Sequence, residues 1–319
     1  MLQPGSLLLG VTAFTLLLLA PEAAYAWGPG THLQVGSQVL ENLAVLSPAL
    51  QDLLRRHPYD FLYGCIGADI IIGKKYRIKQ IFHCHNWSTG FRLLDAAETP
   101  HESAFAYGYL CHLAADTISH NYFVPCQEIA SYSATSLRHT YWEVRFDDFI
   151  DPRMWPLARV VHDEAHGRND GLLQRVLADT IFSFRTNKRI FTGLISLQQV
   201  RHWRKMVTLL ATRSSFPFTR EDFERYYRLT QNAVFAFMID GQASRTVEAD
   251  PIGRRNLHAA ALIRKTLRTL SRRKVLTPEQ CQEIVREVTR SLETGLESAF
   301  REPELLSLPA VRRLAAARR

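Results

Sequence analysis

The residues that could do chemistry are concentrated in the first half of the chain. Eight of the twelve histidines lie within residues 32–139. In the segment HLAADTISH, His112, Asp116 and His120 are spaced four residues apart, so in a helix they share one stripe. Ligands four residues apart on a helix can bind a metal ion from one rigid support.

Further candidate ligands lie on either side of this segment. His139 and Glu143 repeat the four-residue spacing, whereas Asp69 in GADI and the histidines of HCHNW, His83 and His85, have no helical pairing and are weaker signals. Zinc binds histidine nitrogen and carboxylate oxygen, and a carboxylate can bridge two ions. Two or three ions need roughly eight to ten ligands, and the chain offers that many.

The surroundings of Asp116 favour a metal site over a buried polar pair. The carboxylate lies in the largely apolar run AFAYGYLCHLAADTISHNYFV, where burial without a partner would cost several kcal/mol. A single histidine there would be interpreted as a hydrogen-bonded core residue. The whole set of ligand types indicates a metal site.

Another histidine pair, His162 and His166 in HDEAH, is not predicted to bind metal. The zinc-protease pattern requires glutamate directly after the first histidine, and Asp163 stands there. Gly167 and the polar letters RNDG predict a helix end at this point, so we expect surface structure.

Helical periodicity recurs along the chain and strand signals are nearly absent, which predicts an all-α protein: a compact multi-helix domain with a multi-metal site between helices. Thr277 and Gln280 predict a capping box for a helix with Pro278 at its first position. The expected helices cover residues 31–46, 86–98, 101–123 (closed by Pro125), 133–150, 170–184, 187–212, 219–240, 256–274 and 277–300.

The amino terminus resembles a signal peptide. An apolar run over residues 6–20 is followed by Ala24-Tyr25-Ala26, a pattern typical of a signal-peptidase site. The run is shorter than the roughly 20 residues of a membrane-spanning helix. We therefore expect residues 1–26 to be removed on export and the mature chain to begin at Trp27; the alternative is an uncleaved anchor.

The positive charge lies near the carboxyl terminus. Residues 251–319 hold 15 Lys and Arg against 7 Asp and Glu, a net of +8 that equals the charge of the whole chain. This predicts a helical domain over residues 27–250 and a basic helical extension over 251–319. Such a region can attract anionic lipid or nucleic acid, or it is simply a solvated helix face. The five cysteines form no CxxC motif, and we assign them neither disulfides nor metal.

In chain order, the segments WGPGTH, GADI, HCHNW, HLAAD and HTYWE resemble the zinc-dependent phospholipase C family, which is related to the S1/P1 nucleases. The resemblance covers about residues 27–149. It implies that Trp27 binds a metal through its amine and carbonyl oxygen and that His32 binds the same ion.

The resemblance implies zinc as cofactor, with two or three ions. One ion would use Asp69, His85 or His83, His112 and Asp116; a second Trp27, His32 and Asp116; and a third His120, His139 and Glu143. Between the two histidines, the following Asn-Trp favours His85 and the distance from Asp69 favours His83. The family's histidine lies six residues after the bridging aspartate, whereas His120 lies four after it, so its helix would have to present it differently.

The implied activity is phosphodiester hydrolysis by activated water. A phospholipase C would release diacylglycerol and a phosphorylated head group, and Glu143 favours it because the nucleases have aspartate there. Asp69 would act as general base or would orient the water. The alternatives are a single-strand nuclease and a non-catalytic metal-binding or membrane-binding homologue. The expected partner is a phospholipid or membrane surface, with nucleic acid less favoured and no protein partner implied.

Overall fold

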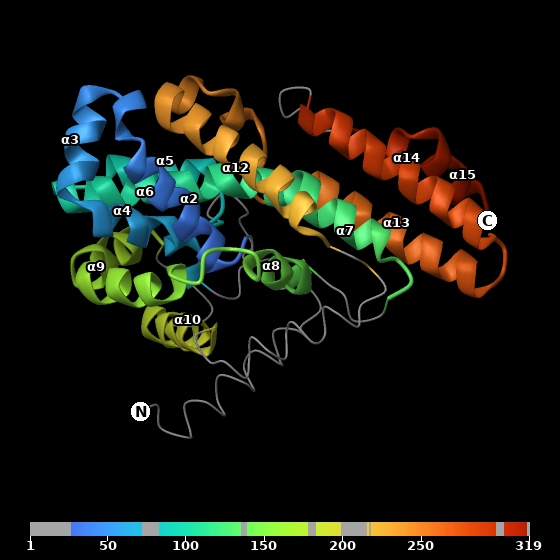
Figure 1. Cartoon of the computed structure of the whole chain (residues 1–319), viewed down its shortest axis with the longest axis horizontal. Coiled ribbons are helices and arrows are strands. Elements are labelled where there is room, and N and C mark those ends of the chain that lie inside the picture. The colour runs from blue at the N-terminus through green and yellow to red at the C-terminus, as the bar shows by residue number, and fades with distance from the viewer. Residues whose placement is uncertain are drawn as a thin grey trace.

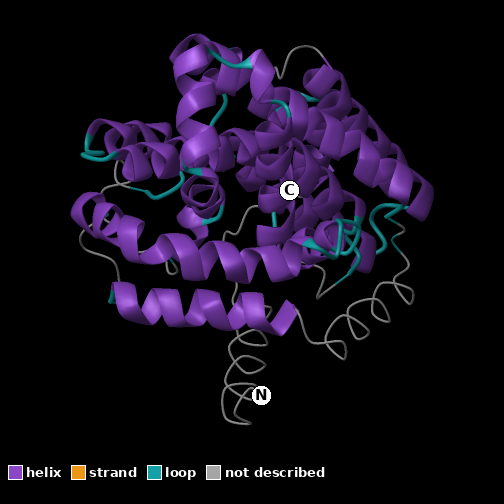
Figure 2. Cartoon of the chain, turned by 60° about the vertical axis from the view of Figure 1, so that its left-hand side comes forward, coloured by secondary structure: helices purple, strands orange, loops and turns teal. Residues whose placement is uncertain are grey.

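The computed structural model describes residues 27–71, 83–134, 139–177, 183–198, 216, 218–297 and 303–317. Helices and short connections make up this part of the chain (Figure 1). It contains no strand, as Figure 2 shows, so the all-α prediction is confirmed for the described residues. The expected signal peptide, residues 1–26, lies outside them. Among them, no helix is long and apolar enough to cross a membrane.

The helices keep the labels of Figure 1. They are α2 (Pro29–Glu41), α3 (Pro48–Arg56), α4 (Pro58–Cys65), α5 (Trp87–Asp95), α6 (Pro100–Ile118), α7 (Val124–Ala130), α8 (His139–Asp147), α9 (Met154–Val176), α10 (Phe184–Gln198), α12 (Arg220–Asp240), α13 (Arg254–Arg272), α14 (Pro278–Glu297) and α15 (Pro309–Ala317). Short helical turns are η1 (Leu43–Val45), η2 (Gly67–Ile70), η5 (Ser119–Phe123), η6 (Gly241–Ala243), η7 (Arg245–Glu248) and η8 (Leu305–Ser307).

Helix α6 lies at the centre of the fold and packs against α4, α5 and α12. It begins where the Thr99 hydroxyl accepts a hydrogen bond from the Glu102 backbone N–H, and nearly all of its later side chains are buried. Helix α4 crosses it in backbone contact. A Cβ at Gly64 would overlap the Phe105 carbonyl oxygen, and one at Gly108 would overlap the Phe61 carbonyl oxygen. This close crossing holds η2, which follows α4, against α6.

Helix α6 does not continue to residue 123, and the prediction that Pro125 closes it is wrong. After Ile118 the chain forms a π-helix, η5, and α7 follows with Pro125 in its first turn. Proline is tolerated there because its missing N–H has no helical partner to lose. The wider π turn changes the direction in which the following side chains point.

Other helix bounds also differ from the predictions. Helix α2 ends at Glu41, and a 3₁₀ turn replaces its expected last residues. Helix α9 runs through Gly167, so the helix end predicted there and the separate helix over 170–184 are wrong. The glycine costs about 1 kcal/mol against alanine, and the buried face of α9, which includes Trp155, Val161 and Leu172, outweighs that cost.

Some expectations are confirmed in part. Helices α8, α10 and α14 lie within or close to the predicted ranges 133–150, 187–212 and 277–300. Residues 135–138, 199–212 and 298–300 of those ranges lie outside the described residues. The capping box of α14 is present: the Thr277 N–H donates to the Gln280 Oε1 at 2.9 Å, and the Gln280 N–H donates to the Thr277 Oγ1 at 3.3 Å.

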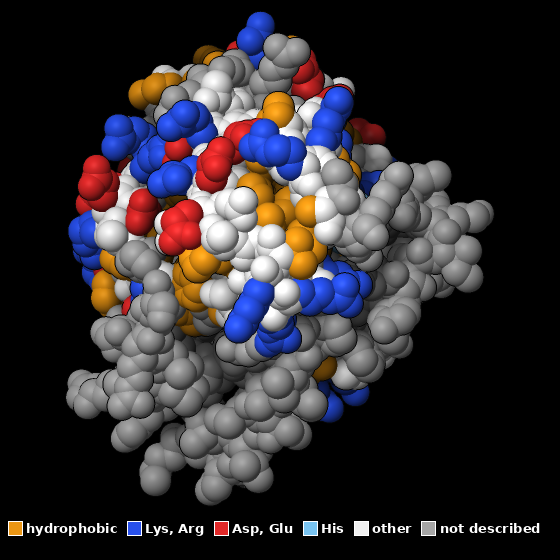
Figure 3. All heavy atoms as spheres, turned by 90° about the vertical axis from the view of Figure 1, so that its right-hand side faces the viewer, with side chains coloured by type: hydrophobic (Ala, Val, Ile, Leu, Met, Phe, Trp, Pro, Cys, Tyr) orange, Lys and Arg blue, Asp and Glu red, His pale blue; other side chains and the backbone are white. Residues whose placement is uncertain are grey.

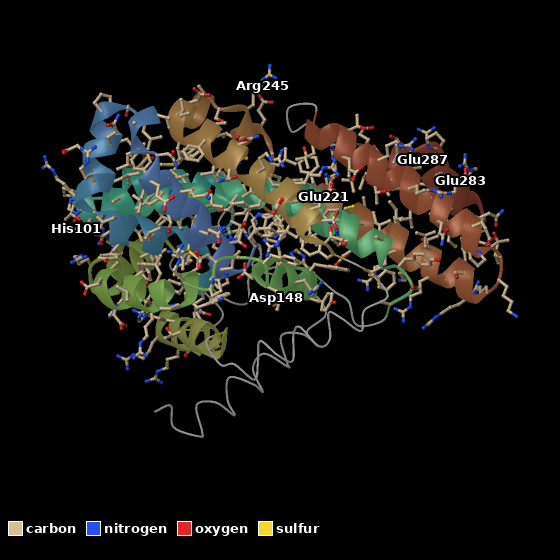
Figure 4. All side chains as sticks on the ribbon, in the orientation of Figure 1. His101, Asp148, Glu221, Arg245, Glu283 and Glu287 are labelled. Carbon is tan, nitrogen blue, oxygen red and sulfur yellow. The ribbon has the colours of Figure 1, made fainter. Side chains whose placement is uncertain are left out.

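Of the last three helices, α13 and α14 both pack against α7 and η5, and α15 packs on α13 and α14. Seen from this end in Figure 3, Lys and Arg side chains are interspersed with Asp and Glu and with hydrophobic side chains. Arg313 of α15 lies 3.9 Å from Glu283 and 3.7 Å from Glu287, both on α14 (Figure 4). Much of this surface therefore carries both positive and negative charges. The boundary at Asp250 stays a prediction.

Candidate metal centre

Asp116 is a fully buried carboxylate of α6 whose two oxygens face different histidines. Its Oδ2 lies 3.1 Å from the Nε2 of His112 and 3.2 Å from that of His85, and its Oδ1 lies 3.3 Å from the Nε2 of His32. Neither oxygen accepts a hydrogen bond of good geometry within the described part of the chain. A carboxylate in this position can bridge two cations.

His112 presents an acceptor nitrogen to this carboxylate. Its Nδ1–H donates to the Cys65 carbonyl oxygen at 2.9 Å, because a carbonyl can only accept. The lone pair of the neutral imidazole is then on Nε2, facing both Asp116 and, at 3.0 Å, the Nε2 of His85. A metal cation would be stabilised by acceptor atoms gathered in this way. Metal-binding histidines usually donate their other ring N–H to a carbonyl or carboxylate, as His112 does here.

His85 is the histidine of HCHNW that reaches the two carboxylates. Its Nε2 lies 3.3 Å from the Oδ1 of Asp69, which η2 brings to the site. The side chain of His83 lies next to it, and its Nδ1 accepts the backbone N–H of His85 at 3.1 Å. The geometry therefore favours His85 as the ligand and His83 as a residue that orients it.

His32 approaches Asp116 from the other side. Its ring stacks on that of His112 with centroids 3.8 Å apart, and neither of its nitrogens has a hydrogen-bond partner among the described residues. Trp27 is held nearby: its indole Nε1–H donates to the Ala115 carbonyl at 3.1 Å and its ring packs on Phe146. The indole ring of Trp27 is thus anchored to α6 at the residue that precedes the bridging carboxylate.

A further group lies next to the first. The Nε2 of His139 is 2.7 Å from the Oε1 of Glu143, one turn along α8. The ring centroid of His120 lies 5.0 Å from that of His139 and 6.4 Å from that of His85. His120 belongs to the π-helix η5, and the wider turn explains how a histidine only four residues after Asp116 faces another group of ligands.

Burial and neighbouring charges set the protonation of this site. Burial, followed by His112, lowers the pKa of His32 to about 4. Burial alone would raise the pKa of Asp116, but His112, with His32 and His85, holds it well below the usual range. At neutral pH His32 is therefore neutral and Asp116 ionised, which are the forms that bind metal.

Comparison with known proteins agrees with this geometry. A family model described as zinc dependent phospholipase C matches residues 31–196, about half of the chain. The chain belongs to the zinc-dependent phospholipase C family. Searches of curated proteins and of solved structures found no match.

The residues present fit the zinc that this family requires. Among the described residues, three of the sets whose ligand atoms lie within 4.8 Å of one another consist of predicted histidine and carboxylate ligands: His32, Asp69 and His112; His85, His112 and Asp116; and His120, His139 and Glu143. A further set of this kind joins His83, Cys84 and His85. Every side chain predicted as a ligand belongs to the three sets except His83, which belongs to the set with Cys84 and His85, and Trp27, whose expected ligand atoms are in the backbone.

Asp147 supports this family site and is absent from the sequence predictions. Its buried carboxylate accepts the backbone N–H groups of Gly30 and Thr31 at 3.1 and 3.0 Å and the Thr31 hydroxyl at 2.5 Å, so it caps α2 just before His32. Burial raises its pKa to about 7 despite these bonds. The sequence contains a signal for this residue, because Asp147 continues the four-residue spacing of His139 and Glu143.

Two other histidine clusters lie apart from the zinc site. His162 and His166 stack within α9, and the Nδ1–H of His166 donates to the His162 carbonyl oxygen at 2.6 Å. Their neighbour Asp163 points to solvent. This exposure agrees with the surface structure expected for HDEAH, although the helix continues through it.

The second cluster contains His57, Asp60 and His101, at the end of the molecule where Figure 4 shows His101. Asp60 accepts hydrogen bonds from Asn169 at 2.6 Å and from the Arg168 Nε at 3.3 Å. The guanidinium already supplies the positive charge that a metal would bring. We interpret this cluster as an ion-pair network that ties α4 and α6 to α9.

Proposed function

We propose that the chain is an exported zinc-dependent phospholipase C that hydrolyses a phospholipid to diacylglycerol and a phosphorylated head group. The observation that carries the proposal is the arrangement around Asp116, whose two oxygens face separate histidine sets in a buried site. Membership of the family supports the same activity.

The proposed ligands divide into three groups. The first consists of Asp69, His85, His112 and Asp116, the second of the Trp27 backbone, His32 and Asp116, and the third of His120, His139 and Glu143. Zinc bound there would supply a nucleophilic hydroxide near neutral pH and positive charge for the phosphate oxygens.

The side chains then have distinct tasks in the hydrolysis. Asp69, a member of the first group, lies 3.3 Å from the Nε2 of His85 and would accept a proton from the attacking water or orient it. The water oxygen forms a bond to phosphorus, the bond from phosphorus to the glycerol oxygen breaks, and that oxygen takes up a proton. Buried apolar side chains nearby, such as Phe123, which packs on Trp27, and Trp142, which precedes Glu143, would exclude bulk water and strengthen the electrostatic interactions.

Export would also contribute to the site. Removal of residues 1–26 would leave the amine of Trp27 as a free terminus, on a residue whose indole is hydrogen-bonded to the Ala115 carbonyl, one position before Asp116. In the family this amine is a ligand, so cleavage would complete the second group.

The proposal is tested with the chain that begins at Trp27, loaded with zinc. Phosphatidylcholine vesicles and single-stranded DNA are offered side by side, and the release of phosphocholine and of nucleotides is measured with and without a chelator. We expect chelator-sensitive hydrolysis of the phospholipid. Hydrolysis of DNA alone would establish a nuclease instead, and a zinc-loaded protein inactive on both would indicate a binding protein.

A further inference from the structure

The turn between η7 and α13 lies directly on the π-helix that contains His120. The Asp250 side chain shapes this turn by accepting the backbone N–H groups of Ile252 at 3.1 Å and Arg254 at 3.3 Å. The turn belongs to the last third of the chain, beyond the segment 31–196 that the family model matches. Its contacts therefore join a distant part of the sequence to a proposed zinc ligand.

The turn determines which ring nitrogen of His120 carries the proton. The Nδ1–H of His120 donates to the Pro251 carbonyl oxygen at 2.5 Å, since a carbonyl offers no proton. In the neutral imidazole the lone pair is then on Nε2, which is the nitrogen that could bind a cation. A carbonyl behind a histidine holds both the tautomer and the direction of the ring.

Gly253 allows this contact because it has no side chain. A Cβ at Gly253 would lie 2.5 Å from both the Cβ and the carbonyl oxygen of His120, closer than such atoms can approach. The residue also has a φ of +62°, in the left-handed region that favours glycine. Any side chain here would displace either the turn or His120.

Two buried asparagines hold the backbone on the other side of His120. The Nδ2 of Asn121 donates to the carbonyl oxygens of Asp250 at 2.8 Å and Thr117 at 3.0 Å, so it ties the turn to α6. Asn256 donates from its Nδ2 to the Asn121 carbonyl oxygen at 2.9 Å. The π-helix is thus hydrogen-bonded to the turn through the Asn121 side chain and to the first turn of α13 through the Asn121 backbone.

We propose that residues 250–256 are a positioning element of the third zinc group. They hold His120 with its Nε2 toward His139 and Glu143, and Gly253 is the residue on which the fit depends. This inference rests on the proposed function, because it takes the third group to be a zinc site.

The test compares zinc binding by the full chain carrying Gly253→Ala with that of a matched variant, Gly241→Ala. Gly241 also has a positive φ, +56°, but a Cβ there would meet nothing within 4 Å. Zinc per protein and competition with a chelator are measured for both variants, with His120→Ala as a reference. We expect Gly253→Ala to bind one ion about 10-fold to 100-fold more weakly, the range for altered support of a ligand, and Gly241→Ala to match the wild type.

A second measurement determines the tautomer of His120 in the metal-free protein. In the metal-free wild type, ¹⁵N chemical shifts are expected to show protonation on Nδ1, and Gly253→Ala should give a mixture of tautomers. If Gly253→Ala does not fold, Asn256→Ala, which leaves the turn's own backbone bonds intact, is expected to weaken the same ion. A folded Gly253→Ala protein with wild-type affinity and an Nδ1–H tautomer would overturn the proposal. Absence of zinc from the wild type would instead overturn the proposed function.

Discussion

Asp116 lies where α6, α2 and the HCHNW loop bring three histidine nitrogens within 3.3 Å of one carboxylate. Its Oδ1 faces His32, and its Oδ2 faces His85 and His112. Loss of this one carboxylate should therefore affect two ions, whereas loss of a terminal ligand such as Glu143 should affect one.

Replacing Asp116 with Asn tests this directly. The amide offers one oxygen and no negative charge, so we expect loss of at least one zinc ion and a fall in hydrolysis of more than about a hundredfold, because altered support alone costs about 10-fold to 100-fold. Asp52→Asn, at an exposed position of α3, is the control and should keep the zinc content and the hydrolysis rate of the wild type. Full zinc content in Asp116→Asn would show that the carboxylate does not bridge.

Asp147 predicts a dependence of stability on pH. Its pKa is raised to about 7 in the fold, from 3.8, so between these values the native state keeps a proton that the unfolded state has lost. Its contribution to the free energy of unfolding therefore falls as pH rises from about 4 to about 7, by up to about 4 kcal/mol.

Asparagine does not titrate, so Asp147→Asn should lack this decline. Urea unfolding of the metal-free proteins at pH 5, 6 and 7 is the measurement. The stability of the variant relative to the wild type is expected to improve steadily with pH. A difference that stays constant across the three values would contradict the raised pKa.

For single residues, the sequence indicated the candidate ligands more readily than the groups that support them. The spacing of His112, Asp116, His139 and Glu143 was visible because helical ligands repeat every four residues. The tautomer of His120 could not be predicted, since it depends on a carbonyl 131 residues away.

Among the elements, the crossing of α4 and α6 determines how closely the ligand-bearing helices approach. The two backbones meet at Gly64 and Gly108, where each glycine faces a carbonyl oxygen of the other helix. Helix α9, in contrast, contains the exposed Gly167, which faces open space.

The same substitution should thus have opposite effects at two helical glycines. Gly108→Ala is expected to lower the free energy of unfolding by about 1–3 kcal/mol or more through overpacking. Gly167→Ala should raise it by about 0.5–1 kcal/mol, because alanine is the better helix former. Denaturant unfolding of both variants checks the pair. A stabilising Gly108→Ala would contradict the close crossing, and a destabilising Gly167→Ala would contradict a continuous α9.

Helix type was predictable from periodicity, but several bounds depended on tertiary structure. The π-helix η5 has no local sequence signal, and it separates two helices that the apolar pattern joined. Helices α3 and α4 were overlooked although Pro48 and Pro58 stand at their starts, a pattern typical of a first helical position.

At the scale of the whole molecule, the proposed centre draws on both ends of the chain. Trp27 is fully buried against Phe146 and beside Ala115, and the turn at residues 250–253 supports His120. Processing at the amino terminus and packing of α13 are therefore both expected to influence metal binding.

A chain that keeps Ala26 tests the role of processing. The extra residue converts the amine of Trp27 into an amide, which cannot bind zinc in the same way, so we expect one ion fewer or about tenfold weaker binding of it. A chain that begins at Trp27 and carries one extra alanine after Arg319 is the control. Equal zinc content and activity in the two forms would show that the Trp27 amine is not a ligand.

The most direct measurement for the account as a whole is anomalous scattering at the zinc edge from crystals of the chain that begins at Trp27. We expect peaks on both sides of the Asp116 carboxylate, one between His85 and His112 and one beside His32, and a further peak among His120, His139 and Glu143. A fully occupied crystal with no zinc peak next to Asp116 would contradict it.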